Sequence, residues 1–327
     1  MAMKKIYFIV NPKAGNGKCQ RVWESVEKKL AELQVSYEAF FTHDQGHATE
    51  LARKAAKLAG GRQAIIAAVG GDGTAHEVLN GIENRENIAF AFIAGGSGND
   101  FSRGFQLPAR PIDALEEILG LAETDPAYAD CGSISIKGGS RLFINSAGIG
   151  FDALVSKKAN ETGMKGIFNR LSLGKLVYVY VLLKELFTYE RGTVEVTADG
   201  LRHIFDETWF VTVSNQPFYG GGMIISPEAV PDDGELNITV VHKLSKVRLL
   251  LVFMSVFSGK HIYFKEVHTF KGREISFDSS PLLHIHADGE YLGRSSWGKI
   301  KAVPGRTRIL SKKLLKKDLQ MGGEANG

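Results

Sequence analysis

Apolar residues near the start of the chain form short continuous runs separated by amphipathic stretches. The runs at residues 6–10, 64–69 and 88–94 have the length and continuous apolarity of strands that are covered on both faces. Between them, apolar residues recur at helical spacing, as at Leu51, Ala55 and Leu58. This alternation predicts an α/β N-terminal nucleotide domain with a parallel sheet, whose ligands lie at the carboxyl ends of the strands.

From about residue 130 the pattern changes to alternating apolar and polar residues, broken by Gly, Asp and Pro turns. The strands predicted from this alternation lie at 193–197, 207–213, 236–241 and 283–286. Two helices are expected to interrupt them, at 152–190 with a break near 163–166, and at 247–257. We therefore predict a mostly-β sandwich-like C-terminal domain, as a sandwich or an open barrel. The expected domains are 1–130, 131–305 and a basic tail, 306–327, that packs back on the first domain.

Composition excludes several classes of protein. A chain of 327 residues with 44% hydrophobic residues is neither disordered nor a small disulfide scaffold. Cys19 and Cys131 form no CxxC motif, which is typical of a reducing compartment. No apolar run reaches the roughly 20 residues that cross a bilayer. The apolar run at 6–10 is shorter than that of a secretory segment, so we expect a first strand there. The net charge of +4 is too small to indicate nucleic-acid binding.

The first predicted strand is followed by a glycine-rich segment, NPKAGNGK at residues 11–18. Small residues in this position let backbone N–H groups approach a phosphate, and Lys18 adds positive charge. The segment is not a Walker loop, because Pro12 stands where that motif needs glycine and Cys19 replaces its serine or threonine. Taken alone, the segment fits an ordinary strand-to-helix turn as well as a nucleotide site.

Two further glycine-rich loops follow the next predicted strands, GGDGT at 70–74 and GGSGNDF at 95–101. In the first loop, three glycines bring the carboxylate of Asp72 onto a tight turn at a helix N-terminus, where backbone donors hold phosphate. That carboxylate is placed to face a metal ion or a hydroxyl. Because parallel strands end at the same edge of a sheet, we expect all three loops to converge on one crevice, although each alone is compatible with a plain turn.

The chain resembles the diacylglycerol kinase catalytic-domain superfamily, and most closely its soluble bacterial lipid kinases. The motifs that carry the resemblance are NPKAGNGK, GGDGTAHEVLNGI at 70–82, GSGNDFSRG at 96–104, SAGIGFDA at 146–153, PDDGEL at 231–236 and ADGE at 287–290. They cover the chain nearly from end to end in the family's order. GGDGT by itself is shared with NAD kinases and phosphofructokinases, so its combination with GSGND specifies the family.

The resemblance implies that ATP lies along the first three loops. The residues expected to bind it are Asn11, Pro12, Lys13, Ala14, Gly15, Thr42, Gly71, Asp72, Gly73, Thr74, Ala75, His76, Glu77 and Ser97. Thr42 follows a strand predicted at 36–41, and from the residues alone it is equally an N-cap or a turn residue. Ser97 stands where relatives often carry threonine, a departure that keeps the hydroxyl.

The resemblance also implies roles for acidic residues in the second half. Asp288 is the expected general base, accepting the proton of the lipid hydroxyl as that oxygen attacks the γ-phosphate across a cleft. Without the family, Asp288-Gly289 predicts a hairpin turn. Asp233 is expected to hold a structural Mg²⁺ with the backbone carbonyls of Val230 and Glu235, although its segment is also typical of a plain turn.

The expected function is ATP- and Mg²⁺-dependent transfer of the γ-phosphate to a lipid hydroxyl, with diacylglycerol as the acceptor and phosphatidic acid as the product. Domain 131–305 then binds the lipid, and the enzyme is expected in the cytoplasm, peripheral to the inner face of the membrane. Basic residues near apolar ones favour membrane contact, although the solvated faces of ordinary helices show the same pattern. These basic residues are Lys243, Lys246, Arg248, Lys312, Lys313, Lys316 and Lys317. The alternatives are an NAD kinase-like enzyme and a non-catalytic membrane-associated sensor of nucleotide or lipid. A homodimer is left open.

Overall fold

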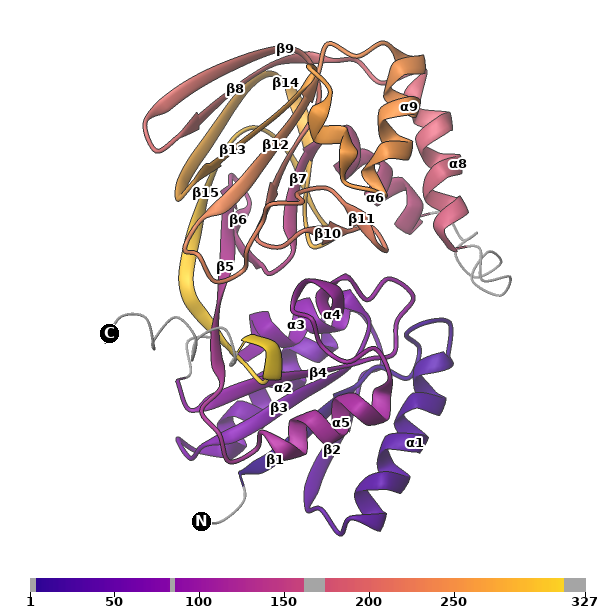
Figure 1. Cartoon of the computed structure of the whole chain (residues 1–327), viewed down its shortest axis with the longest axis vertical. Helices are drawn as coiled ribbons and strands as arrows, with labels where there is room; N and C mark the ends of the chain where they lie inside the picture. Colours follow the sequence, from indigo (N-terminus) through magenta and orange to yellow (C-terminus); the bar gives the residue numbers. More distant parts are fainter. Residues whose placement is uncertain (1–3, 83–85, 162–173, 315–327) are drawn as a thin grey trace. The chain divides into compact units, whose positions relative to one another are not determined.

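The computed structural model describes residues 4–82, 86–161 and 174–314, with the side chains of 174–179 excepted. The chain divides into two compact units, Met1–Ala129 with Gly305–Gly327, and Asp130–Pro304. Each unit has its own apolar core. The first unit thus takes segments from both ends of the chain, and the second is continuous in sequence (Figure 1).

The first unit alternates strands and helices, as the apolar pattern predicts. Its elements are β1 (Lys5–Val10), α1 (Lys18–Glu32), β2 (Tyr37–Phe41), α2 (His47–Ala59), β3 (Ala64–Gly70), α3 (Asp72–Ile82), β4 (Ile88–Ala94), α4 (Asp100–Gly104) and α5 (Pro111–Gly120). Helices α1 and α2 start after Gly17 and Gly46, and both glycines adopt the left-handed conformation that other residues avoid. Each helix therefore begins where the sequence allows the chain to turn sharply.

The first four strands pair in the order β4-β3-β1-β2, with parallel register between each pair of neighbours. In this order β2 lies beside β1 on one side and β4 lies beside β3 on the other, so the connection after β1 and the connection after β3 run in opposite directions. The loops at the carboxyl ends of two such strands diverge and leave room for a ligand. The loops that follow β1 and β3 are the first two glycine-rich segments.

Both faces of this sheet are buried. Helices α1 and α5 cover one face, where Trp23, Val26 and Leu30 pack on apolar side chains of β1, β3 and β4. Helices α2 and α3 pack together and contact β1, β3 and β4 from the other face (Figure 1). Every residue of β3 and β4 is buried, which explains why their sequences are apolar without alternation.

The second unit is rich in strands. Its elements are β5 (Ala127–Ile136), β6 (Gly139–Phe143), β7 (Ser146–Gly150), α6 (Phe151–Glu161), α8 (Gly174–Leu186), β8 (Gly192–Ala198), β9 (Leu201–Ser214), β10 (Phe218–Tyr219), β11 (Met223–Ile224), β12 (Leu236–His242), α9 (Lys246–Val256), a 3₁₀ helix η1 (Lys260–Tyr263), β13 (Val267–Gly272), β14 (Glu274–Ala287) and β15 (Glu290–Ile309). The helix predicted at 152–190 corresponds to α6 and α8, and its predicted break lies outside the described residues.

In the second unit β5 pairs with β6, β9 with β7, β8 and β12, β12 with β13, and β14 with β7, β8 and β15, all in antiparallel register. The long strands β9 and β14 each pair with β8 along one part and with β7 along another. The register of β14 shifts between Asp278 and Leu283, and Glu207 in β9 has a φ of 49°. Such bulges bend a strand and let it change partners, so the strands enclose one core.

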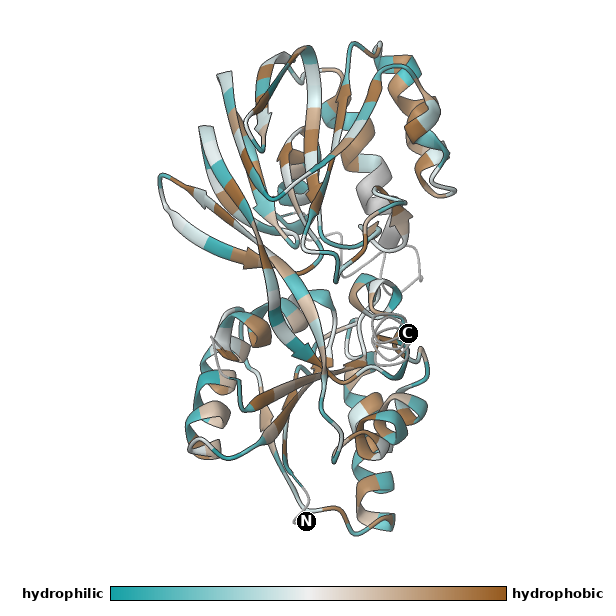
Figure 2. Cartoon of the chain, turned by 60° about the vertical axis from the view of Figure 1, so that its left-hand side comes forward, coloured by the Kyte–Doolittle hydropathy of each residue, from teal (hydrophilic) through white to brown (hydrophobic). Residues whose placement is uncertain are grey.

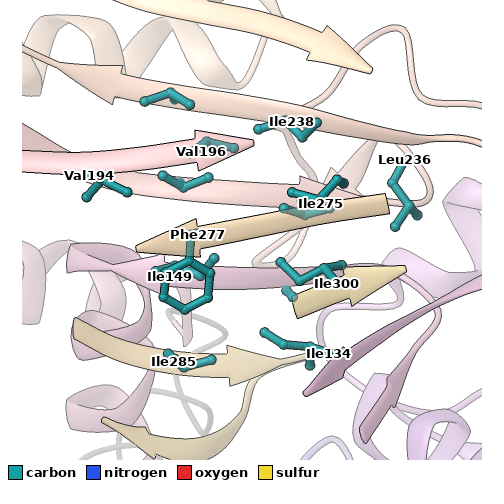
Figure 3. Packing of buried hydrophobic residues seen from close by; sticks show 14 of the residues in the cluster. Ile134, Ile149, Val194, Val196, Leu236, Ile238, Ile275, Phe277, Ile285 and Ile300 are labelled. Atoms are coloured by element: carbon teal, nitrogen blue, oxygen red, sulfur yellow. The ribbon is translucent and has the colours of Figure 1, made fainter. Parts of the chain in front are cut away.

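Alternate residues of these strands point into that core. Figure 3 shows Ile149, Phe277, Ile285 and Ile300 among its buried side chains. The colours along the strands in Figure 2 alternate between hydrophobic and hydrophilic, as expected for half-buried strands. The predicted β-rich domain is confirmed. The prediction for β14 was too short, because it covered only 283–286 and missed the part before the bulge.

The start of the basic tail packs on the first unit. Ile309, at the end of β15, pairs in parallel with Phe90 of β4, and Leu310 is buried in the core beneath α1 and α5. The hydroxyl of Ser311 donates to the carbonyl of Phe105 at 3.3 Å. Residues 315–327, which include Lys316 and Lys317, lie outside the described residues. Within the described ranges, no helix is long and apolar enough to cross a membrane.

Candidate active site

Asn11 joins the loop after β1 to the loop after β3. Its backbone N–H donates to the carbonyl of Val69 at 2.9 Å, and its side-chain Nδ2 donates to Oγ1 of Thr74 at 3.1 Å. The Oδ1 atom accepts the N–H of Lys13 at 3.2 Å. Asn11 therefore spans the point at which the connections of the parallel sheet diverge.

The loop after β2 is attached to the same edge of the sheet. Thr42 donates its N–H to the carbonyl of Val10 at 2.9 Å, and its side chain is buried. The ammonium of Lys13 donates to the carbonyl of His43 at 2.7 Å. Thr42 directly follows β2, which matches the strand predicted at 36–41 and pairs with β1.

The three glycine-rich loops are in contact. A Cβ atom added to Gly96 would lie 2.5 Å from Cα of Gly71, and one added to Gly15 would lie 2.6 Å from the carbonyl oxygen of Gly95. Real Cβ atoms do not approach other atoms so closely, so glycine is required where these loops meet. The convergence expected from the sequence is thus present within the first unit.

Two acidic residues of α3 bind backbone amides of neighbouring loops. The carboxylate of Asp72 accepts the N–H of Phe101 at 2.8 Å and so connects the GGDGT and GSGND loops. The two oxygens of Glu77 accept the N–H groups of Gly46 and Ala48, at 3.0 and 3.1 Å, where α2 begins. Both carboxylates position loops, which the motif alone did not indicate.

The surroundings of the loops favour an anion. Helix α3 begins at Asp72, within the second loop, and the N-terminus of a helix carries partial positive charge with backbone donors. Thr74, Ala75 and His76 are buried behind the loop, whereas Ser97 is exposed.

Burial raises the pKa of Cys19 to about 11, so this thiol, packed under Gly95, is not a nucleophile at neutral pH.

Asp288 lies in the second unit, in the turn between β14 and β15. Asp288 and Gly289 have φ values of 48° and 83°, so the hairpin predicted from Asp-Gly is present. The carboxylate accepts three backbone N–H groups, from Ile144 at 2.8 Å, Asn145 at 2.9 Å and Ser146 at 3.0 Å. We call these three N–H groups the amide cradle of Asp288. An aspartate in a plain turn does not need such contacts, and here they fix the direction of the carboxylate.

Behind this turn lies a buried pair that the sequence did not single out. Nδ1 of His286 accepts the N–H of Gly289 at 3.2 Å, and Nε2 lies 3.6 Å from Oδ2 of Asp152. Thr212 donates to the same Asp152 oxygen at 3.4 Å. A Cβ on Gly148 would lie 2.1 Å from that oxygen, so the glycine of the SAGIG segment makes room for the pair.

The segment expected to hold a structural metal contains a different arrangement. Oδ1 of Asp233 accepts the N–H of Glu235 at 3.0 Å, and Oδ2 accepts the ammonium of Lys271 at 2.8 Å. Carboxylate and carbonyl oxygens suit Mg²⁺ chemically, but here a cation of the protein already contacts the carboxylate. Among the described residues, no group of three or more His, Cys, Asp or Glu side chains is placed to hold a metal ion. Both oxygens of the Asp233 carboxylate thus contact groups of the protein.

Comparison with known proteins covers most of the chain. The model of the diacylglycerol kinase catalytic domain matches residues 5–131, and that of the YegS C-terminal NAD kinase beta sandwich-like domain matches 145–311. A Bacillus subtilis protein named "Putative lipid kinase YtlR" is 34% identical over 310 residues, which is 94% of this chain and 99% of that protein. The chain belongs to the diacylglycerol kinase catalytic-domain family. As a member of this family it is a lipid kinase.

Other relatives agree with this family assignment. A protein of Mycobacterium tuberculosis named "Diacylglycerol kinase" is 29% identical over 309 residues, covering 94% of each chain. The crystal structure of a diacylglycerol kinase from Bacillus anthracis str. Sterne matches with a TM-score of 0.68 and 22% identity, over 96% of this chain and 99% of that chain. This structural likeness supports the fold: an N-terminal catalytic domain followed by a β-rich C-terminal domain.

The structure brings together the expected ATP-binding residues of the first unit at the carboxyl ends of β1 to β4. Asn11 to Gly15, Thr42, Gly71 and Ser97 lie on the loops, and Asp72 to Glu77 form the start of α3. Asp288 and Asp233 belong to the second unit and lie on different turns. The amide cradle of Asp288 was missed, although its last member, Ser146, begins the family motif SAGIGFDA.

Proposed function

We propose that this lipid kinase transfers the γ-phosphate of Mg-ATP to the hydroxyl of a membrane lipid, with diacylglycerol as the acceptor and phosphatidic acid as the product. The observation that carries the proposal is the contact between the GGDGT and GSGND loops at the ends of β3 and β4. The acceptor is inferred from relatives named diacylglycerol kinase that align over nearly the whole chain.

In this proposal the loops of the first unit bind the triphosphate. Backbone N–H groups of the glycine-rich loops and the N-terminus of α3 face the phosphate oxygens, and Thr42 and Ser97 contribute hydroxyls. Mg²⁺ enters with ATP and neutralises charge on the phosphates. The positioning of the triphosphate then depends on loops that cannot separate without breaking the Asp72 contact to Phe101.

Asp288 acts as the general base on the acceptor. Its carboxylate takes the proton of the lipid hydroxyl while the hydroxyl oxygen bonds to the γ-phosphorus and the bond to the β-phosphate oxygen breaks, releasing ADP. The N–H groups of Ile144, Asn145 and Ser146 hold this carboxylate in a fixed direction, so its orientation toward the acceptor hydroxyl is set by the backbone.

Contact with a membrane is assigned to the outer face of α9. Val247, Leu251 and Met254 recur at helical spacing and are 73%, 66% and 67% exposed. Phe187, just beyond α8, is 69% exposed and lies beside Lys246, whose ammonium donates to the Phe187 carbonyl. Helix α9 contains no acidic residue, so apolar and basic side chains share one surface, as in helices that lie on anionic bilayers.

The inner sides of α8 and α9 are already used by the protein's own core. Leu182 and Leu186 of α8 pack in one buried cluster with Leu249 and Val252 of α9. The exposed apolar stripe is therefore not needed for folding and is free to meet lipid. This assignment agrees with an enzyme that is cytoplasmic and peripheral to the inner face of the membrane.

The test is to incubate the purified protein with Mg-ATP labelled at the γ-phosphate and a total lipid extract, and to identify the phosphorylated species by mass spectrometry. We expect phosphatidic acid as the labelled product. Parallel reactions with NAD separate the lipid kinase from an NAD kinase-like enzyme. Label in NADP and none in lipid would overturn the proposal, and lipid binding without any labelled product would favour a sensor.

A further inference from the structure

The ammonium of Lys271 lies beside the carboxylate of Asp233, which is the expected ligand of a structural Mg²⁺. Its Nζ lies 2.8 Å from Oδ2 of Asp233 and 3.8 Å from Oε2 of Glu235. The other Asp233 oxygen accepts the N–H of Glu235. Both oxygens of the expected metal ligand are therefore bound by groups of the protein itself.

Asp233 and Glu235 both face cations of the protein. Two cations face them from the end of β13 and the residue after it, since Nε of Arg273 lies 3.9 Å from Oε1 of Glu235. A Mg²⁺ bound to Oδ2 of Asp233 at its usual distance of about 2.1 Å would lie within about 5 Å of the Lys271 nitrogen. At that separation the ammonium repels a divalent cation and competes for the same oxygen.

Strand pairing holds Lys271 in this position. Lys271 lies opposite Asn237 in the antiparallel pair of β12 and β13, and β12 starts directly after Glu235. The Lys271 side chain is 38% exposed and that of Asp233 is 25% exposed. The register of the sheet thus places the Lys271 ammonium beside the Asp233 carboxylate, where it is partly shielded from water.

Other hydrogen bonds of the turn also come from the protein. The carboxylate of Asp130 accepts the N–H of Gly234 at 2.7 Å, and the Asp130 N–H donates to the carbonyl of Pro231 at 2.7 Å. Gly234 has a φ of 75°, which glycine adopts without strain. Side chains and backbone groups therefore fix the path of residues 231–235.

We propose that the ammonium of Lys271 takes the place of the structural Mg²⁺ in this chain, so that the 231–235 turn is held without a divalent cation. The Mg²⁺ that accompanies ATP is then the divalent ion that the reaction uses. The inference concerns the chain without nucleotide and stands apart from the identity of the lipid acceptor.

The test uses the full-length protein without ATP or lipid, so a failure of the proposed kinase reaction cannot affect it. Thermal unfolding is measured in EDTA and across a MgCl₂ titration, with calorimetric titration of MgCl₂ alone. For the unmodified protein we expect the same Tm in both conditions and no saturable heat. Lys271→Met is expected to lower the Tm in EDTA by about 2–4 °C and to regain it as Mg²⁺ binds the released carboxylate.

Two further variants serve as controls. Lys271→Arg keeps the positive charge and is expected to behave as the unmodified protein does. Lys301→Met removes an equally ordinary ion pair, since Lys301 lies 2.7 Å from Glu274 on the same unit and both side chains are exposed. It is expected to show no response to Mg²⁺, because the Glu274 carboxylate that it leaves unpaired is 71% exposed and stays hydrated.

Saturable Mg²⁺ binding by the unmodified protein, lost in Asp233→Asn, would overturn the inference. A Lys271→Met variant that folds and does not respond to Mg²⁺ would also overturn it, because the ammonium would then not be what keeps the metal away. If Lys271→Met fails to fold, the comparison of the unmodified protein with Asp233→Asn still decides the question.

Discussion

Gly96 and Gly71 approach so closely that a Cβ on Gly96 would lie 2.5 Å from the Gly71 Cα. The Gly71 Cα is a backbone atom and a Cβ is bonded directly to the backbone of residue 96, so neither can move aside without separating the two loops. We therefore predict that Gly96→Ala raises the KM for ATP at least about tenfold and removes the rise in Tm that Mg-ATP causes. Gly120→Ala is the control, because a Cβ there meets nothing within 4 Å. Unchanged ATP binding by Gly96→Ala would show that these loops do not hold the nucleotide.

Gly73, in the same motif, gives a complementary prediction. A Cβ on Gly73 meets nothing within 4 Å, so Gly73→Ala should fold normally, with a free energy of unfolding unchanged or raised by up to about 1 kcal/mol. If phosphate approaches this backbone, the added methyl should nevertheless weaken ATP binding by about tenfold. Calorimetric titration with Mg-ATP measures the affinity. Normal affinity would place the phosphates elsewhere along the loops.

For Asp288 we predict that substitution by asparagine lowers kcat by at least about 10²-fold, the usual contribution of a general base, with little change in the KM for ATP. Because the amide group of asparagine presents a donor to one of the three N–H groups, the variant should also lose about 1–3 kcal/mol of stability. Steady-state kinetics and chemical unfolding measure the two effects. Asp278→Asn, at an exposed position on β14, is the control and should leave both unchanged.

The outer stripe of α9 is predicted to govern binding to lipid. The double variant Leu251→Gln and Met254→Gln should reduce binding to phosphatidylglycerol vesicles by about tenfold or more, with no loss of Tm, because both side chains are exposed. Leu201→Gln with Ile204→Gln is the matched control, since these residues of β9 are 69% and 57% exposed. Equal vesicle binding by the two double variants would remove α9 from this role. Kinase activity on detergent-dispersed lipid should persist in both.

His284 is predicted to make the protein less stable in acid. Burial, with the positive charge of Arg294 as a further cause, lowers the pKa of His284 to about 4, whereas in the unfolded chain the ordinary value is about 6.5. Between these values the unfolded chain binds more protons than the folded chain, so stability falls as the pH drops from about 6.5 to 4. His284→Gln should reduce this slope, as Tm measured across the pH range would reveal. Parallel curves for the two proteins would contradict the prediction.

The first unit could be predicted closely from sequence because burial on both faces leaves a strong signal. Strands β3 and β4 are apolar at every position, and each is followed at once by glycines. The convergence of the loops followed from the parallel arrangement, since such strands end at a common edge. The hydrogen bonds by which Asp72 and Glu77 hold neighbouring loops could not be predicted, because their partners are backbone amides that carry no sequence signature.

The second unit was predicted less completely. Strands β6 and β7 are short, and β7 consists of small residues, SAGIG, that show no alternation. The Asp288 cradle joins residues 142 to 144 positions apart, which no local pattern reports. Lys271 is a similar case. Nothing in the sequence near Asp233 indicates that a lysine on β13 lies beside it, because the contact depends on strand register.

The pairing of Ile309 with Phe90 has a consequence for how the chain is made. A ribosome makes the four parallel strands long before residue 309, so β4 has an open edge, and the core under α1 lacks Leu310, until the second unit has also been made. The unit that is begun first is therefore completed after the second. A nascent chain stalled at residue 304 would present an unpaired strand edge and a gap in its core, and it would be a natural target for chaperones and proteases.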